Sequence, residues 1–332
     1  MNRIQLSKEG SYYHCSSETV HTLGWLDQEG KAVFVKILHK VAAFCGVTVV
    51  TYCVMDSHFH LLIKVPPREA REGVTDKELM RRFRALYGDG RTRYMPMDAD
   101  VLEGILKEDG TAARQWRELL LGRMCDLPMF MKMLKQRFSK WYNATHACRG
   151  TLWAQRFSST LLDPNERVLT QVAAMIDTHA LRMGAAEHPE DYPWCGFAAA
   201  RAGDSAQEAA LCGIVEPKRG PFADKVLLGY EVMLYRLCGL EPKKTRRQLM
   251  REVLMGAEGM GGNNNVWPYN TMEARILDRV ANLTAAMVYG SYVFVEAQAQ
   301  WVAKLLKRKK PKGCYQLGEG EWTLNQRLKK DL

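Results

Sequence analysis

Two histidines, His58 and His60, flank a single phenylalanine in the segment MDSHFHLLIKVP. On a β-strand, residues i and i+2 point to the same face, with their Cα atoms about 7 Å apart. Two imidazoles on one face form half of a ligand set for a divalent metal, because neutral imidazole is a common metal ligand. The pattern is short, so two unrelated, half-buried histidines remain the alternative.

The segments around this pair predict the order strand, helix, strand, strand. Residues 11–16 predict the first strand, and residues 29–44 predict a helix, because apolar residues recur there at helical spacing. The apolar, β-branched run 47–54 predicts the second strand, and residues 58–65 predict the third. The histidine pair therefore begins the second strand of a predicted hairpin.

The middle of the chain predicts more helices and one further strand. Helices are predicted over 76–87 and 127–145, and a strand over 152–162. Pro164 is expected to open another helix that runs to Gly184. The proposed division of the chain is a domain over 10–200 with an insertion at 68–125, a linker over 201–221 that is rich in small residues, and a mainly helical extension over 222–332 that ends in a basic tail.

Composition excludes several classes of protein. Hydrophobic residues make up 47% of the 332 residues and charged residues 25%, which excludes wholesale disorder, collagen and coiled coil. No segment approaches the ~18 uncharged apolar residues of a membrane helix, and MNRIQLSKEG lacks the apolar region of a signal peptide. Nine cysteines with no CxxC spacing favour reduced thiols, so we expect a cytoplasmic protein.

The net charge of +10 is concentrated near the end of the chain. Residues 1–213 hold 27 basic and 25 acidic residues, whereas residues 301–332 hold 9 and 3. Clustered basic residues favour an anionic partner, which is either nucleic acid or an anionic membrane surface. A merely solvated tail is the alternative.

Three segments resemble, in order and spacing, motifs of one protein family. MDSHFHLLIKVP resembles the HUH metal motif of single-tyrosine transposases. RGTLWAQRF, at 149–157, resembles a Gly-Thr-Leu-Trp segment of REP-associated tyrosine transposases, which are relatives of the insertion-sequence-200 transposases. DYPWCGF, at 191–197, resembles the Tyr-Pro-Trp segment that follows the catalytic helix in that family. The resemblance covers roughly residues 10–200.

The resemblance implies a fold and an activity. The implied fold is α+β, a ferredoxin-like antiparallel sheet with helices that binds single-stranded DNA, often a hairpin. In the family, a Mg or Mn ion on the two histidines polarises the scissile phosphate, and a tyrosine on the following helix attacks it to form a phosphotyrosine link. This chemistry is sound, because the metal neutralises phosphate charge and a phenolate is both nucleophile and leaving group.

The chain departs from the family in the catalytic helix. The matching run is MIDTHALRMG, at 175–184, and it has Met175 at the nucleophile position. A thioether forms no stable phosphoester, so the covalent step is lost at this position. His179 replaces a metal-facing Asn and shares a helix face with position 175, which makes it a candidate third ligand with His58 and His60. Three imidazoles favour Zn, Ni or Co over Mg.

Tyr142 is the weak candidate for a substitute nucleophile, although the family usually has a core aromatic at this place.

The expected DNA contacts are arginines that pair with phosphates, and Trp153 as a stacking surface. A core position is the alternative for Trp153. The complete set of expected DNA contacts is Arg149, Trp153, Arg156, Arg182, Lys307, Arg308, Lys309 and Lys310.

The sequence thus predicts a transposase-like protein that recognises hairpin or single-stranded DNA ends and is impaired in strand cleavage, with DNA rather than a membrane as its partner. One alternative is an active single-strand transposase that uses another tyrosine. A second alternative is a metal-binding scaffold without a DNA role. The sequence leaves the oligomeric state open, with a homodimer among the options, and does not decide whether the chain is an enzyme.

Overall fold

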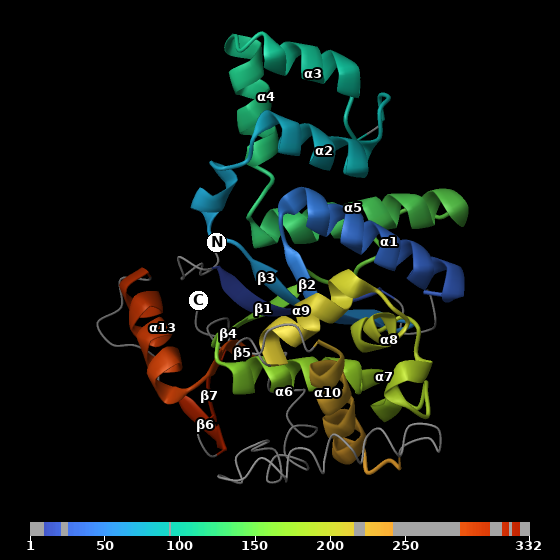
Figure 1. The fold of residues 1–332 in the computed structure, drawn as a ribbon, viewed down its shortest axis with the longest axis vertical. Coiled ribbons are helices and arrows are strands. Elements are labelled where there is room, and N and C mark those ends of the chain that lie inside the picture. Colours follow the sequence, from blue (N-terminus) through green and yellow to red (C-terminus); the bar gives the residue numbers. More distant parts are fainter. Residues whose placement is uncertain are drawn as a thin grey trace. The chain divides into compact units, whose positions relative to one another are not determined.

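The computed structural model describes residues 10–20, 26–92, 94–215, 223–241, 286–305, 314–318 and 321–325. Helices and a mostly antiparallel sheet of seven strands form an α+β fold (Figure 1), which confirms the predicted fold class. The chain divides into two compact units, the first being 1–12, 17–49 and 63–157, and the second 13–16, 50–62 and 158–332. None of the described helices is long and apolar enough to cross a membrane.

The sheet has the strand order β2-β3-β1-β4-β5-β7-β6. Its strands are β1 (Ser11–Glu18), β2 (Thr48–Val54), β3 (His58–Val65), β4 (Ser158–Leu162), β5 (Ala286–Gly290), β6 (Tyr315–Gly318) and β7 (Glu321–Asn325). β4 pairs in parallel with β5, with Leu161 opposite Val288. β7 pairs antiparallel with both β5 and β6.

The first unit is built from helices α1 (Gln28–Cys45), α2 (Asp76–Tyr87), α3 (Ala99–Lys107), α4 (Thr111–Leu121) and α5 (Leu127–Thr145), with a 3-10 turn at Arg68–Arg71. α1 and α5 lie side by side (Figure 1), and the rings of Phe34 and Phe138 meet edge to face between them. Gly46 ends α1 with φ of 69°, a left-handed conformation that glycine adopts without strain.

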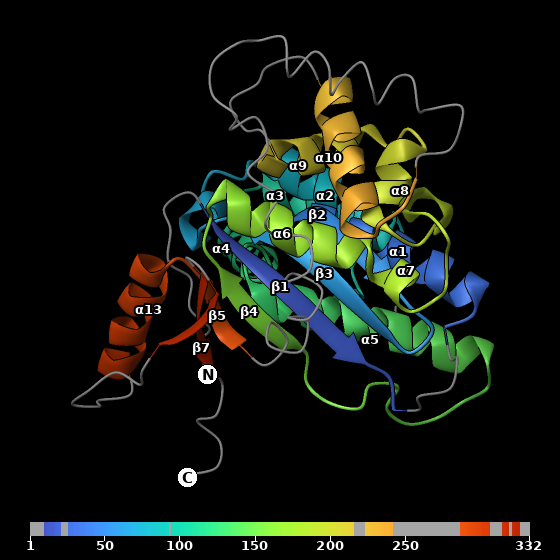
Figure 2. The same cartoon turned by 90° about the horizontal axis from the view of Figure 1, so that it is seen from below.

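The second unit contains helices α6 (Glu166–Asp177), α7 (His179–Arg182), α8 (Gly196–Arg201), α9 (Ser205–Val215), α10 (Ala223–Leu237) and α13 (Tyr292–Leu305), with a 3-10 turn at Pro189–Asp191. α6 runs along the sheet (Figure 2), and α9 packs against α6, α8 and α10. The middle of β1, the end of β2 and the beginning of β3 also belong to this unit.

Predictions for the first half of the chain are close to the structure. The helices predicted over 76–87 and 127–145 and the strand predicted over 58–65 have the same bounds as α2, α5 and β3. The strand predicted over 152–162 is wrong in its first part, since β4 begins at Ser158. Its earlier residues form only a single bridge, between Trp153 and Thr19.

Other boundaries need correction. Pro164 does not open α6, because the side chain of Asn165 accepts a hydrogen bond from the Arg167 amide and caps the helix one residue later. The helix also does not continue to Gly184, because α6 ends at Asp177 and a separate short α7 follows.

Two segments are more structured than predicted. The segment 201–221, expected to be a linker, contains α9, whose side chains Leu211 and Ile214 are buried. The extension over 222–332 contains the predicted helical content in α10 and α13, and it also contributes β5, β6 and β7, which were not predicted.

Candidate metal centre

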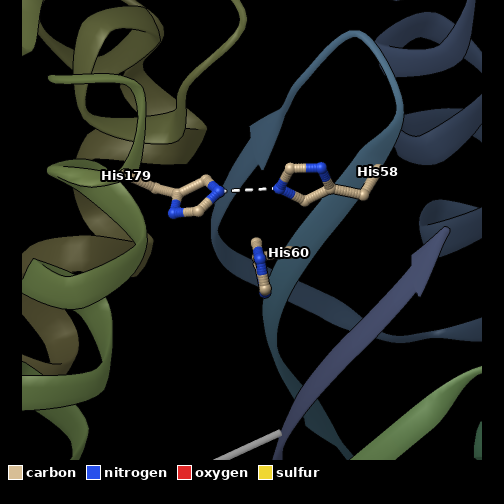
Figure 3. A group of neighbouring side chains, drawn as sticks. All are labelled: His58, His60 and His179. Atoms are coloured by element: carbon tan, nitrogen blue, oxygen red, sulfur yellow. Dashed lines mark hydrogen bonds between the residues drawn. The ribbon is translucent and has the colours of Figure 1, made fainter. Parts of the chain in front are cut away.

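Three histidines of the second unit point toward one another (Figure 3). His58 and His60 lie on β3, and His179 is the first residue of α7. The Nε2 atoms of His58 and His179 share a hydrogen bond at 2.7 Å. One ring nitrogen from each histidine lies within 4.8 Å of the others, so the three could hold one metal ion.

The β2–β3 hairpin places His58 and His60. The amide of Met55 donates to the carbonyl of His58 at 2.8 Å and closes the turn. The segment that follows α7 fixes the end of β2, because the Tyr192 hydroxyl donates to the carbonyl of Val54 at 2.8 Å. The Val54 amide donates in turn to the carbonyl of Trp194. The Tyr-Pro-Trp segment therefore holds the hairpin that carries the two histidines.

Gly196 allows this close contact between the segment and β2. A Cβ atom at position 196 would overlap Oγ1 of Thr51 and would lie 2.9 Å from its Cα atom. No side chain fits in that space, so the backbone can approach β2 only with glycine at this position.

Asp177 anchors the break between α6 and α7 that presents His179. Its Oδ1 accepts hydrogen bonds from the Thr51 hydroxyl at 2.5 Å, from the Phe197 amide and from the Cys195 thiol. Its Oδ2 accepts one from the Tyr230 hydroxyl at 2.7 Å. These bonds connect the end of α6 to β2, α8 and α10. Complete burial of Asp177 raises the pKa of its carboxyl to about 6.

The buried histidines are poor bases. Burial lowers the pKa of His179 to about 3, with further lowering by the charges of His58 and Arg182. Burial also holds the pKa of His60 well below its ordinary value. Both imidazoles are therefore neutral near pH 7, and a neutral imidazole has the lone pair that a metal requires.

His14 on β1 completes the cluster, although sequence reasoning did not select it. Its Nε2 shares a hydrogen bond with Nδ1 of His60 at 3.0 Å, and the two rings stack with centroids 5.2 Å apart. Burial lowers the pKa of His14 to about 4. When Nδ1 of His60 donates to neutral His14, the lone pair on Nε2 of His60 is left to bind a metal. In known metal sites, the ring nitrogen of a histidine ligand that does not bind the metal likewise donates a hydrogen bond. The signal available in the sequence was a histidine on a predicted strand.

Arg182 contacts the other side of the cluster. Its Nη2 donates to the carbonyl of Met175 at 2.8 Å and lies 3.2 Å from Nδ1 of His179. The side chain of Arg182 is partly buried and lies against His179 within the second unit. Arg182 was predicted to contact DNA. The structure shows in addition that Arg182 contacts His179.

The donor set fits a borderline divalent ion such as Zn or Co. Two imidazole nitrogens on one tetrahedral ion are roughly 3.3 Å apart when each bond is about 2.0–2.1 Å. For His58 and His179 to hold one ion together, their 2.7 Å contact would have to lengthen by a few tenths of an ångström, and the hydrogen bond between the two rings would have to break.

Comparisons with known proteins give one structural similarity. No protein-family model matches the chain, and no curated protein matches it. Among solved structures, the chain is similar to a REP-associated tyrosine transposase bound to a REP hairpin, with 13% sequence identity and a TM-score of 0.37. The similarity covers 61% of this chain and 85% of that chain.

The two candidate nucleophile positions belong to different units. Met175 lies in α6 of the second unit and is 1% exposed. Tyr142 lies in α5 of the first unit, where it is buried and stacks on His146 with ring centroids 4.0 Å apart. Burial raises the pKa of Tyr142, which disfavours the phenolate. This environment is that of a core aromatic.

Apart from Arg182, the expected DNA contacts fall into three groups. Arg149 and Arg156 are exposed in the loop between α5 and β4 of the first unit. Trp153 is buried there, and its Nε1 donates to the Ser139 hydroxyl at 2.7 Å. This burial favours the core alternative for Trp153 over a stacking surface. The basic run 307–310 lies outside the described residues.

The low pKa of His14 predicts a pH-dependent stability for the metal-free protein. The unfolded chain takes up a proton near the ordinary value of 6.5, whereas folded His14 does so only near 4. The unfolded state therefore binds more protons between these values, and stability falls as the pH drops through 6.5. Between pH 7 and pH 5 the loss from His14 is about 2 kcal/mol.

Urea unfolding in EDTA at pH 7 and pH 5 measures this loss. The other buried histidines act in the same direction, and Asp177 opposes them because its pKa is raised. His14→Asn should therefore show a smaller difference between the two pH values than the unaltered protein. An equal difference in both proteins would show that His14 is not held neutral.

Proposed function

We propose that this protein is a metal-dependent DNA-binding protein related to the REP-associated tyrosine transposases, acting in the cytoplasm on hairpin or single-stranded DNA ends. The observation that carries the proposal is the cluster of His58, His60 and His179, with ligand nitrogens within 4.8 Å of one another. The motif resemblance and the basic end of the chain support DNA as the partner.

The metal would be held by His58 and His60 from β3 and by His179 from α7. When bound, a divalent ion supplies charge that neutralises a phosphate oxygen. His14 orients the ring of His60, and Asp177 holds the backbone that presents His179. Metal analysis of purified protein tests the third ligand, because His179→Ala should lower the metal content. Unchanged content would remove His179 from the ligand set.

The same site supports binding better than cleavage. By the motif resemblance, Met175 stands at the family's nucleophile position; it is buried, and its thioether cannot form a phosphotyrosine-like link. With labelled hairpin DNA and Mn²⁺, no covalent adduct is expected on a denaturing gel. Met175→Tyr should create an adduct if the rest of the site is competent.

An adduct formed by the unaltered protein would favour the rival proposal of an active transposase. If that adduct survived Met175→Ala and disappeared with Tyr142→Phe, the nucleophile would be Tyr142.

Electrophoretic mobility shifts test the DNA partner directly. The protein should bind hairpins from the DNA that flanks its coding gene more tightly than unstructured oligonucleotides of equal length. Arg149 and Arg156 are exposed and are proposed to contact the phosphate backbone. No shift at low salt would favour a metal-binding scaffold without a DNA role.

The basic tail provides a separate prediction. Residues 301–332 hold 9 basic and 3 acidic residues and include Lys307, Arg308, Lys309 and Lys310. Deleting residues 326–332, which lie outside the described strands and contain Arg327, Lys329 and Lys330, should lower DNA affinity and flatten its salt dependence. For duplex DNA the logarithmic slope decreases by about 0.9 for each phosphate that the shortened protein no longer neutralises. Binding measured at several salt concentrations checks this, and an unchanged slope would identify these residues as a merely solvated end.

A further inference from the structure

Arg182 determines where the proton of His179 lies. A guanidinium group has only donors and stays protonated in proteins. The contact between its Nη2 and Nδ1 of His179, at 3.2 Å, therefore requires Nδ1 to accept. Neutral imidazole carries one proton, so in this arrangement the proton of His179 is on Nε2.

The neighbouring contacts agree with this assignment. With its proton on Nε2, His179 donates to Nε2 of His58 across the 2.7 Å contact. His58 then has its own proton on Nδ1, which lies 3.2 Å from the Ser57 hydroxyl oxygen. The hydrogen bonds run in one direction from Arg182 through His179 and His58 to Ser57.

This arrangement withholds one ligand from the metal. His58 keeps a lone pair on Nε2, but the Nε2 of His179 is protonated and cannot bind an ion. For His179 to bind through Nε2, its proton must move to Nδ1, and the Arg182 donor must leave that nitrogen. Metal binding by all three histidines and the contact between Arg182 and His179 therefore exclude each other.

We propose that Arg182 is a positioning residue that couples metal binding to phosphate binding. A DNA phosphate that draws the guanidinium away from Nδ1 of His179 allows the proton to move and His179 to bind the ion. Metal and DNA phosphate then increase each other's affinity by the same factor, as linkage requires. The identity of the anion as a DNA phosphate rests on the proposed function. The role of the Arg182 donor does not depend on it.

Two observations support an anion as the group that releases Arg182. Among the described residues, the buried Nε atom of Arg182 has no hydrogen-bond partner, which is a cost that an arriving phosphate oxygen can remove. The Arg182 guanidinium also lies beside the cluster, with its Nη2 3.2 Å from Nδ1 of His179, so its charge disfavours further positive charge there. A phosphate paired with this arginine reduces that repulsion toward a metal ion.

Titration of the metal-free protein with Co²⁺ tests the role of Arg182 without DNA. Arg182→Met removes the donor and the charge, so Co²⁺ should bind more tightly, by about 5-fold to 150-fold, the usual range of coupling between sites. Arg182→Lys keeps a donor and should restore weaker binding. Unchanged or weaker Co²⁺ binding by Arg182→Met would overturn the proposal, because a merely structural role predicts that result.

A second measurement needs no variant. Long-range ¹H–¹⁵N correlation spectra of the metal-free protein assign the tautomer of each histidine. His179 should be protonated at Nε2. A proton on Nδ1 of His179 would overturn the proposal even if Arg182→Met failed to fold.

The DNA arm repeats the Co²⁺ titration with a short hairpin oligonucleotide. The hairpin should tighten Co²⁺ binding in the unaltered protein and have a much smaller effect in Arg182→Met. An equal effect of sodium sulfate at the same concentration would overturn DNA as the source of the anion. Failure of the proposed function is distinguishable, because it would appear as no hairpin binding in mobility shifts. The tautomer of His179 and the Co²⁺ affinity of Arg182→Met would still decide the role of Arg182.

Discussion

Replacing Asp177 with alanine is expected to lower the free energy of unfolding by about 3 kcal/mol or more. The carboxyl is 1% exposed and accepts hydrogen bonds from four groups on β2, α8 and α10. Without it, the Thr51 and Tyr230 hydroxyls lose a buried acceptor. Urea unfolding of the metal-free protein at pH 7 measures the effect.

Asp100→Ala is the matched control for this experiment. Asp100 pairs with Arg84 at 2.8 Å, but its side chain is 84% exposed. Surface ion pairs contribute about 0–1 kcal/mol, so this variant should be close to the unaltered protein. Equal effects of the two substitutions would contradict the anchoring role of Asp177.

The second large effect is expected at the metal ligands. His60→Ala should lower Co²⁺ affinity by more than about 100-fold, because loss of a group that only supports a ligand already costs 10-fold to 100-fold. His60 is 6% exposed and lies between His14 and His179 in the cluster. Equilibrium dialysis with metal analysis measures the change.

His146→Ala serves as the control for metal binding. His146 is exposed and belongs to the first unit, whereas the three candidate ligands belong to the second. This variant should bind Co²⁺ like the unaltered protein. If His60→Ala retained full affinity, the bound metal would not be at the three-histidine cluster.

Local patterns predicted the elements that carry the histidine pair. The run 47–54 is apolar and β-branched, and the strand at 58–65 follows it after a tight turn, so these signals depend only on neighbouring residues. The hypothesis that His179 joins the pair came from the family resemblance, and the structure brings the three rings together. Their role as ligands stays a proposal.

Contacts between distant segments could not be predicted in the same way. His14 and His60 are 46 positions apart, and Thr51 and Asp177 are 126 apart. No local periodicity reports such a pairing, which depends on the order of strands in the sheet.

Weak local signals explain the missed elements. α9 has Ala and Gly among its residues, a composition that also suits a linker. β5, β6 and β7 have at most five residues each, and β5 pairs with β4 across more than 120 positions of sequence. Short strands of this kind are stabilised by distant partners rather than by their own pattern.

The affinity for a DNA hairpin with and without metal tests the central claim most directly. In EDTA the protein should bind the hairpin weakly, and adding Co²⁺ should tighten binding in the unaltered protein but not in His60→Ala. The same dissociation constant with and without Co²⁺ in the unaltered protein would contradict a metal centre that acts in DNA binding.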